Sequence, residues 1–260
     1  AVGSRPSLMR SGTPVAALSA VLGAAMLVAG VPVPLAIAGA LATGVVCGFV
    51  NGALIAWGGL QPFIVTLGGL SLYRALALIY TGGQPIFGLP DGFRAFTNGS
   101  LAGVPNPVVI VAVLALGAWI ILNKTPLGEY FMAVGGNPEA ARLSGINVLR
   151  YKLMAFVLCS GAAGFAGVLF ASRLRSINPA GLTGAELTVI AAAILGGTSL
   201  FGGAGSVIKT LAGALLLYSL TNGFNILNLG ANWQGLIEGI VVVVAAAIYT
   251  VGNQGQAKGH

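Results

Sequence analysis

Long apolar stretches, separated by short polar or glycine- and proline-rich segments, dominate the pattern of hydrophobic and polar positions along this chain. No charged side chain occurs in residues 11–73, 95–123, 187–208 or 239–257. A helix needs roughly 20 apolar residues to cross the hydrocarbon core of a bilayer, whereas apolar runs of about 10–14 residues are more typical of buried core helices. The pattern therefore predicts an all-α, polytopic transmembrane helix bundle that forms a single domain over residues 1–260.

Hydropathy and helix-breaking residues divide this bundle into about eight membrane segments. The segment at 186–200 is short and ends in glycines, and the one at 33–57 is long and glycine-rich. We expect some segments to be broken, tilted or re-entrant, which is tolerated where protein or water covers the freed backbone. Four segments begin near a proline, a residue that fits the first turn of a helix: Pro14, Pro32, Pro62 and Pro107. The predicted segments are 14–30, 33–57, 62–80, 107–123, 152–171, 186–200, 207–226 and 233–251.

Small residues recur at helical spacing in two of these segments. Small side chains let the backbones of two membrane helices approach closely. We interpret both series as packing surfaces with no transport role of their own. Their members are Ala40, Gly44, Gly48 and Gly52 in one segment and Gly161, Gly164 and Gly167 in the other.

Composition and charge support a membrane protein with its termini on the cytosolic side. The chain is 57% hydrophobic and 7% charged, against about 25% charged residues in soluble domains. Its net charge of +7 does not indicate nucleic-acid binding, because the basic residues lie at the ends of apolar segments and not on one face. With both termini cytosolic, the basic residues favour the cytosolic side, as the positive-inside rule requires. That side holds Arg5, Arg10, Lys124, Arg142, Arg150, Lys152, Lys209 and Lys258, and the other holds Arg94, Arg173 and Arg175.

Residues that carry enzyme or metal chemistry are scarce. His260 is the only histidine, and Cys47 and Cys159 lie inside predicted spans, so we expect neither a histidine-based metal site nor a disulfide framework. No cluster of nucleophile, base and metal ligands can be assembled, which argues against an enzyme. The glycine-rich region 196–205 lacks the Gly-Lys-Ser/Thr ending of a phosphate-binding loop. We predict that it forms the cytosolic turn between the sixth and seventh spans.

Polar side chains within the spans are the candidates for a solute pathway. Such residues are energetically expensive in a membrane and usually face a cavity or a neighbouring helix. We select Asn51, Asn222 and Asn225 as pathway residues, with a helix–helix hydrogen bond as the alternative for each. Three charges lie close to the spans. We expect Glu186 and Glu238 to stabilise the external starts of their helices and Arg74 to extend toward the membrane surface.

The loop between the fourth and fifth spans contains the sequence of a short helix. Asn137 suits the N-cap and Pro138 the first turn, and Glu139 complements the positive end of the helix dipole. Arg142 favours the opposite end, and Gly145 can stop the helix. A short helix held between two spans on the cytosolic side would suit the docking of a soluble partner. A structured turn that only links two spans would explain the same residues.

The segment at 135–146 resembles the cytosolic loop of permeases from bacterial ATP-binding-cassette (ABC) importers of ribose, xylose and related monosaccharides. The resemblance continues through residues 191–200, Ala-Ala-Ala-Ile-Leu-Gly-Gly-Thr-Ser-Leu, and residues 221–225, Thr-Asn-Gly-Phe-Asn. It also includes residues 81–86, Thr-Gly-Gly-Gln-Pro-Ile, and residues 125–128, Thr-Pro-Leu-Gly. It covers nearly the whole chain, with specific motifs in the second half and a looser match before residue 60.

This resemblance implies a multi-pass permease subunit in the bacterial inner membrane that forms the translocation pathway for a sugar. Besides membrane lipid, the implied partners are a second permease copy, a cytosolic ABC ATPase and a periplasmic or lipid-anchored sugar-binding protein. ATP would be used by the partner ATPase, and this chain would need no cofactor. The residues that would couple the permease to the ATPase are Glu139, Ala140, Ala141, Arg142, Leu143 and Gly145.

Members of this family usually have about ten spans, with an Asp-Leu-Ser-Val-Gly-Ser motif near the third. Residues 1–4, Ala-Val-Gly-Ser, resemble the end of that motif, so we expect the two preceding spans to be absent from this chain. Two other functions stay open. One is an ion-coupled secondary transporter, although such proteins usually place ionisable groups at mid-membrane. The other is an ABC permease for a solute that is not a sugar.

Overall fold

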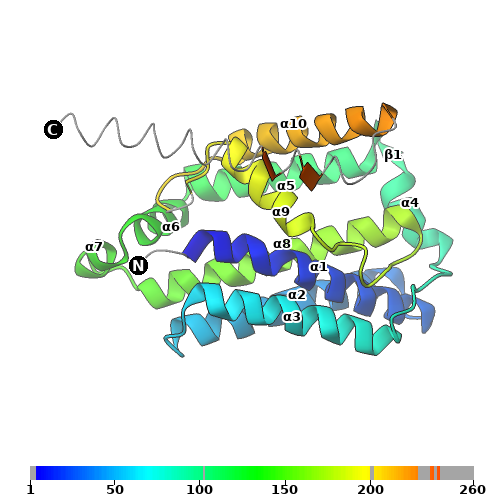
Figure 1. Cartoon of the computed structure of the whole chain (residues 1–260), viewed down its shortest axis with the longest axis horizontal. Helices are drawn as coiled ribbons and strands as arrows, with labels where there is room; N and C mark the ends of the chain where they lie inside the picture. Colours follow the sequence, from blue (N-terminus) through cyan, green and yellow to red (C-terminus); the bar gives the residue numbers. More distant parts are fainter. Residues whose placement is uncertain (1–3, 102, 200–201, 228–234, 237–238, 241–260) are drawn as a thin grey trace.

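The computed structural model describes residues 4–101, 103–199, 202–227, 235–236 and 239–240, and the described chain is almost entirely helical (Figure 1). Long helices form a bundle, and shorter elements connect them at its two ends. The elements in chain order are α1 (Ser4–Val28), α2 (Val33–Ala56), α3 (Pro62–Thr81), α4 (Asp91–Asn98), β1 (Ser100–Leu101), β2 (Val104–Pro105), α5 (Asn106–Lys124), α6 (Pro126–Gly136), α7 (Pro138–Leu143), α8 (Val148–Leu174), α9 (Ala185–Leu195) and α10 (Val207–Ile226).

Five of the described helices, α2, α3, α5, α8 and α10, are long and apolar enough to cross a membrane. Two shorter apolar helices, residues 12–28 of α1 and the whole of α9, lie at the predicted first and sixth spans. Helix α9 ends at Leu195, with Gly196 as its C-cap, because Gly197 then adopts a left-handed conformation with φ 73°. The structure therefore supports the all-α membrane bundle but does not confirm all eight spans. The predicted last span, 233–251, lies almost entirely outside the described residues.

Prolines mark helix starts as predicted, with one exception. Pro62 is the first residue of α3, and Pro107 is the second residue of α5. Pro14 lies instead inside α1, which begins at Ser4. Pro14 therefore does not mark the start of the helix, because the chain before it is also helical although proline has no backbone N–H to donate. The apolar part of α1, residues 12–28, nevertheless begins close to the predicted membrane segment at 14.

Helices α2 and α8 pack closely along their small-residue surfaces. A Cβ atom on Gly44 would lie 2.7 Å from the backbone oxygen of Ser160, and one on Gly48 would lie 2.7 Å from the backbone oxygen of Phe156. From the other side, a Cβ atom on Gly164 would lie 3.2 Å from the Cα atom of Gly44. The predicted packing role of both small-residue series is thus confirmed.

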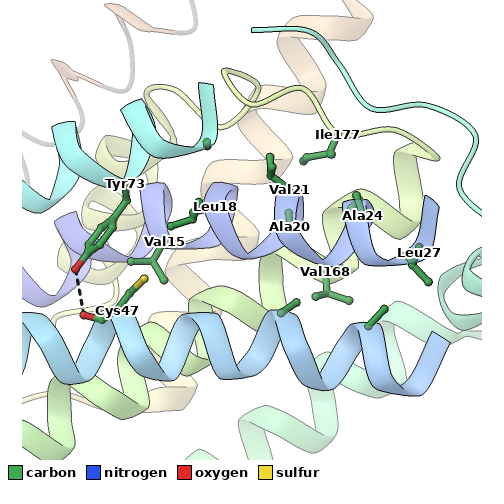
Figure 2. Packing of buried hydrophobic residues seen from close by; sticks show 14 of the residues in the cluster. Val15, Leu18, Ala20, Val21, Ala24, Leu27, Cys47, Tyr73, Val168 and Ile177 are labelled. Atoms are coloured by element: carbon green, nitrogen blue, oxygen red, sulfur yellow. Dashed lines mark hydrogen bonds between the residues drawn. The ribbon is translucent and has the colours of Figure 1, made fainter. Parts of the chain in front are cut away.

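Helix α1 occupies the centre of the hydrophobic core (Figure 2). Val15, Leu18 and Val21 of α1 are buried and join a cluster that includes residues of α2, α3 and α8. Phe93 of α4 and Ile177, which follows α8, belong to the same cluster. Because its described side chains from residue 12 to residue 21 are nearly all buried, α1 serves mainly as an interior element around which the other helices pack.

The segment between α3 and α5 is partly ordered into secondary structure. Helix α4 packs against α8, and β1 pairs with β2 in an antiparallel hairpin. The hydroxyl of Ser172 in α8 donates a hydrogen bond of 2.7 Å to the backbone oxygen of Phe93 and lies 2.8 Å from the hydroxyl of Thr97. These buried bonds hold α4 against α8 at the end of the bundle opposite α7 (Figure 1).

Candidate functional site

Helix α7 lies at one end of the bundle, where it extends beyond the ends of the long helices (Figure 1). The side chain of Asn137 accepts hydrogen bonds of 3.1 Å from the backbone N–H groups of Glu139 and Ala140, which caps the helix. Pro138 is its first residue, and Gly145 follows its end with φ 80°. The predicted helix, with its cap and its stop, is confirmed.

One face of α7 is anchored and the other is open. Ala141 is 4% exposed and packs with Val134 of α6 and Val148 of α8. Leu143, by contrast, is 83% exposed at the end of the helix. The remaining residues predicted to contact an ATPase, Glu139, Ala140, Arg142 and Gly145, are also exposed. The structure thus separates Ala141, which holds the helix in place, from the five that are accessible to a partner.

Aromatic side chains hold α6 against α8 beside this helix. The ring of Tyr151 in α8 lies 5.1 Å from the ring of Tyr130 and 5.8 Å from the ring of Phe131, measured between centroids. Aromatic pairs at such distances add about 0.5–1.5 kcal/mol each beyond the area that they bury. The sequence interpretation treated the segment before Asn137 as a loop, although Pro126 at the start and Gly136 at the end are helix signals that could have revealed α6.

A cavity of about 620 Å³ lies between α5, α6, α8 and the first turn of α10. Its wall is mostly apolar, with polar groups from Lys152, Thr198, Ser206 and Thr210. The last three flank the glycine-rich turn between α9 and α10, and the sequence interpretation did not select them. None of the predicted pathway residues lines this cavity.

The three predicted pathway residues occupy different environments. Asn51 of α2 is 2% exposed, and its Oδ1 atom accepts a hydrogen bond of 2.9 Å from the hydroxyl of Tyr73 in α3. Its Nδ2 atom is buried without a hydrogen-bond partner among the described residues. Asn222 and Asn225 are exposed near the end of α10. The geometry therefore gives Asn51 a contact between helices, and a role in the pathway stays a prediction for all three.

The charged residues near the spans form an ion pair. A guanidinium nitrogen of Arg74 lies 3.4 Å from Oε1 of Glu186, and Oε2 of Glu186 accepts a hydrogen bond of 3.1 Å from the backbone N–H of Gly184. Glu186 stands in the first turn of α9, as expected, so its charge also opposes the positive end of the helix dipole. Arg74 thus binds Glu186, and its expected extension toward the membrane surface stays a prediction. Glu238 lies outside the described residues.

No group of three or more His, Cys, Asp or Glu side chains that could hold a metal ion occurs in the part of the chain that the structure describes.

Comparisons with known proteins agree with the resemblance that the motifs indicate. A family model described as branched-chain amino acid transport system / permease component matches residues 12–246. The ribose import permease protein RbsC of Escherichia coli (strain K12) is 42% identical over 217 residues, which cover 82% of this chain and 68% of that protein. The D-allose transport system permease protein AlsC of the same strain is 36% identical over 233 residues, which cover 89% of this chain and 72% of that protein.

A further relative differs in the solute that it is named for. The autoinducer 2 import system permease protein LsrC of Salmonella paratyphi B (strain ATCC BAA-1250 / SPB7) is 39% identical over 226 residues, covering 87% of this chain and 65% of that protein. No solved structure gives a significant match.

Proposed function

Because the chain belongs to the family described as branched-chain amino acid transport system / permease component, we propose that it carries a monosaccharide of the ribose or allose type across the membrane. It is a permease subunit of an ABC importer and not an enzyme. The observation that carries the choice of solute is the 42% identity with a ribose import permease, which extends over 82% of the chain.

The proposed coupling element is α7. Its accessible residues, Glu139, Ala140, Arg142, Leu143 and Gly145, would enter a cleft of a cytosolic ABC ATPase. Leu143 is 83% exposed at the end of this charged helix, so it offers apolar surface whose burial would favour binding, and the charges around it favour correct orientation. ATP would then be bound and hydrolysed by that partner alone.

The proposed assembly contains two permease copies, two ATPases and a sugar-binding protein outside the membrane. Helix α7 and the α4–hairpin region lie at opposite ends of the bundle (Figure 1), which suits an ATPase on one side and a binding protein on the other. The basic residues Lys124, Arg142 and Arg150 lie in the connected segments at the α7 end. By the positive-inside rule, they support a cytosolic location for that end, with the plasma membrane of a bacterium as the location of the whole complex.

The experiment that tests the solute is uptake by cells that express the chain together with its own ATPase and binding protein. We expect accumulation of labelled D-ribose or D-allose that requires ATP hydrolysis. A second candidate, import of a non-sugar solute, is favoured by the 39% identity with an autoinducer 2 permease. Uptake of autoinducer 2 without uptake of either sugar would select that candidate and reject the sugar.

A further inference from the structure

Two pairs of adjacent glycines meet backbone to backbone beside α7. Gly135 and Gly136 are the last residues of α6, and Gly202 and Gly203 lie in the turn between α9 and α10. A Cβ atom on Gly202 would overlap the backbone oxygen of Gly135, and one on Gly203 would lie 2.9 Å from the Cα atom of Gly136. Gly202 and Gly203 also have φ values of 96° and 76°. Glycine is therefore required here both by conformation and by space.

On one side of this glycine contact, the connection to α7 is short and rigid. Gly136 is followed directly by Asn137, whose side chain caps α7. The backbone N–H of Asn137 also donates a hydrogen bond of 3.0 Å to the backbone oxygen of Ala133 in α6. One hydrogen-bonded residue, Asn137, therefore joins the glycine contact to α7.

On the other side, the turn is fixed to both α9 and α10. The hydroxyls of Thr198 and Thr210 lie 3.0 Å apart, which ties the start of the turn to the first part of α10. The backbones themselves are close, since a Cβ atom on Gly196 would lie 2.6 Å from the Cα atom of Thr210. A Cβ atom on Gly213 of α10 would likewise overlap the backbone oxygen of Ala192 in α9. The described part of the turn is therefore in close contact with both helices.

Helix α9 extends this connection away from α7. Its 11 residues span about 16 Å at a rise of 1.5 Å per residue. At its far end, Glu186 binds Arg74 of α3, and α9 also contacts α1. Rigid helices joined by close contacts are the kind of physical connection along which coupling between distant sites travels.

We propose that the contact of Gly135 and Gly136 with Gly202 and Gly203 transmits movement of α7 to α9 and α10, and thereby links the ATPase to the membrane helices. This proposal rests on the proposed coupling role of α7. It assigns Gly202 and Gly203 as positioning residues for transport, although neither would touch the solute or the ATPase.

The test compares two glycine substitutions in the same turn within the complete complex. Gly202→Ala introduces a Cβ against the backbone of Gly135. Gly197→Ala is the matched control, because Gly197 has a similar positive φ of 73° but nothing within 4 Å of its Cβ position. We expect Gly202→Ala to lower sugar uptake per ATP hydrolysed by roughly 3- to 30-fold, in the range found for substitutions along coupling networks, while the ATPase stays bound. Gly197→Ala should keep most of the coupling.

Equal losses in the two variants would overturn the proposal, because backbone strain alone would then explain them. Unchanged coupling in Gly202→Ala would overturn it as well. If Gly202→Ala does not assemble, Gly203→Ala is measured against the same control and judged by the same two outcomes, since its Cβ overlaps the backbone of α6 less than that of Gly202 does. Failure of the coupling role of α7 is recognised separately, because substitution of Leu143 would then leave ATPase binding intact.

Discussion

The guanidinium of Arg74 in α3 lies 3.4 Å from the carboxylate of Glu186 in the first turn of α9. The side chains are 27% and 14% exposed and come from two helices that both contact α1. A charged side chain that is partly removed from water is destabilising when it has no counter-charge. The ion pair therefore favours this arrangement of α3 and α9 mainly because breaking it would leave such a charge unpaired.

We expect Glu186→Gln to lower the thermal stability of the purified protein by an amount equivalent to about 1–3 kcal/mol, because Arg74 loses its counter-charge. Glutamine keeps an oxygen that can accept the hydrogen bond from Gly184, so the effect on the helix start is small. A double-mutant cycle with Arg74→Gln measures the coupling between the two residues. Strictly additive losses in the double variant would show that the ion pair contributes nothing.

Removing the hydrogen bond between Tyr73 and Asn51 tests whether Asn51 serves helix packing or solute transport. Tyr73→Phe removes the donor to Asn51, which leaves a buried amide with no partner among the described residues. The expected loss is about 1–3 kcal/mol of stability, with the KM for uptake unchanged in the protein that remains folded. Thermal unfolding and initial uptake rates measure the two effects. A raised KM with unchanged stability would instead place Asn51 in the solute pathway.

The effect of a larger side chain at a glycine of α2 on stability should depend on how close the neighbouring helix lies. Gly48→Ala places a Cβ 2.7 Å from a backbone oxygen of α8, so we expect a destabilisation of about 1–3 kcal/mol from overpacking. Gly68→Ala in α3 is the matched helical control, because nothing lies within 4 Å of its Cβ position. It should be neutral or stabilising by up to about 1 kcal/mol, since alanine is the better helix former. Melting temperatures of both variants in the same detergent give the comparison, and similar losses would contradict the close approach of α2 and α8.

Leu143 should be important for the ATPase but not for folding. Leu143→Asp changes a side chain that is 83% exposed, so stability should change by less than about 0.5 kcal/mol. Full burial of a leucine side chain is worth about 1.5–3 kcal/mol, so ATPase retention should fall by roughly 10-fold or more. Co-purification of the ATPase measures this binding. Leu101→Asp is the control, because Leu101 is 66% exposed at the opposite end of the bundle, and equal losses in the two variants would argue against docking at α7.

Some of this structure follows from neighbouring residues alone. Asn137, Pro138 and Gly145 specify where α7 begins and ends, because caps, prolines and left-handed glycines act within one helical turn. The long apolar runs determine where helices of membrane length form, because the hydrocarbon thickness sets their length. The four-residue spacing from Ala40 to Gly52 likewise shows that one face of α2 is smooth.

Other features depend on residues that are far apart in the sequence. The spacing of small residues in α2 does not say that α8 is the helix that packs there. Arg74 and Glu186 are separated by 112 positions, and nothing near either residue reveals its partner. Polarity marks Asn51, Asn222 and Asn225 alike, yet the packing of the folded chain buries Asn51 beside Tyr73 and leaves the other two exposed. The sequence by itself thus determined where the helices of this protein form, including the exposed helix α7. Only the tertiary structure decided the contacts of Gly202 and Gly203 with α6, because these contacts depend on the close approach of backbones that are distant in the sequence.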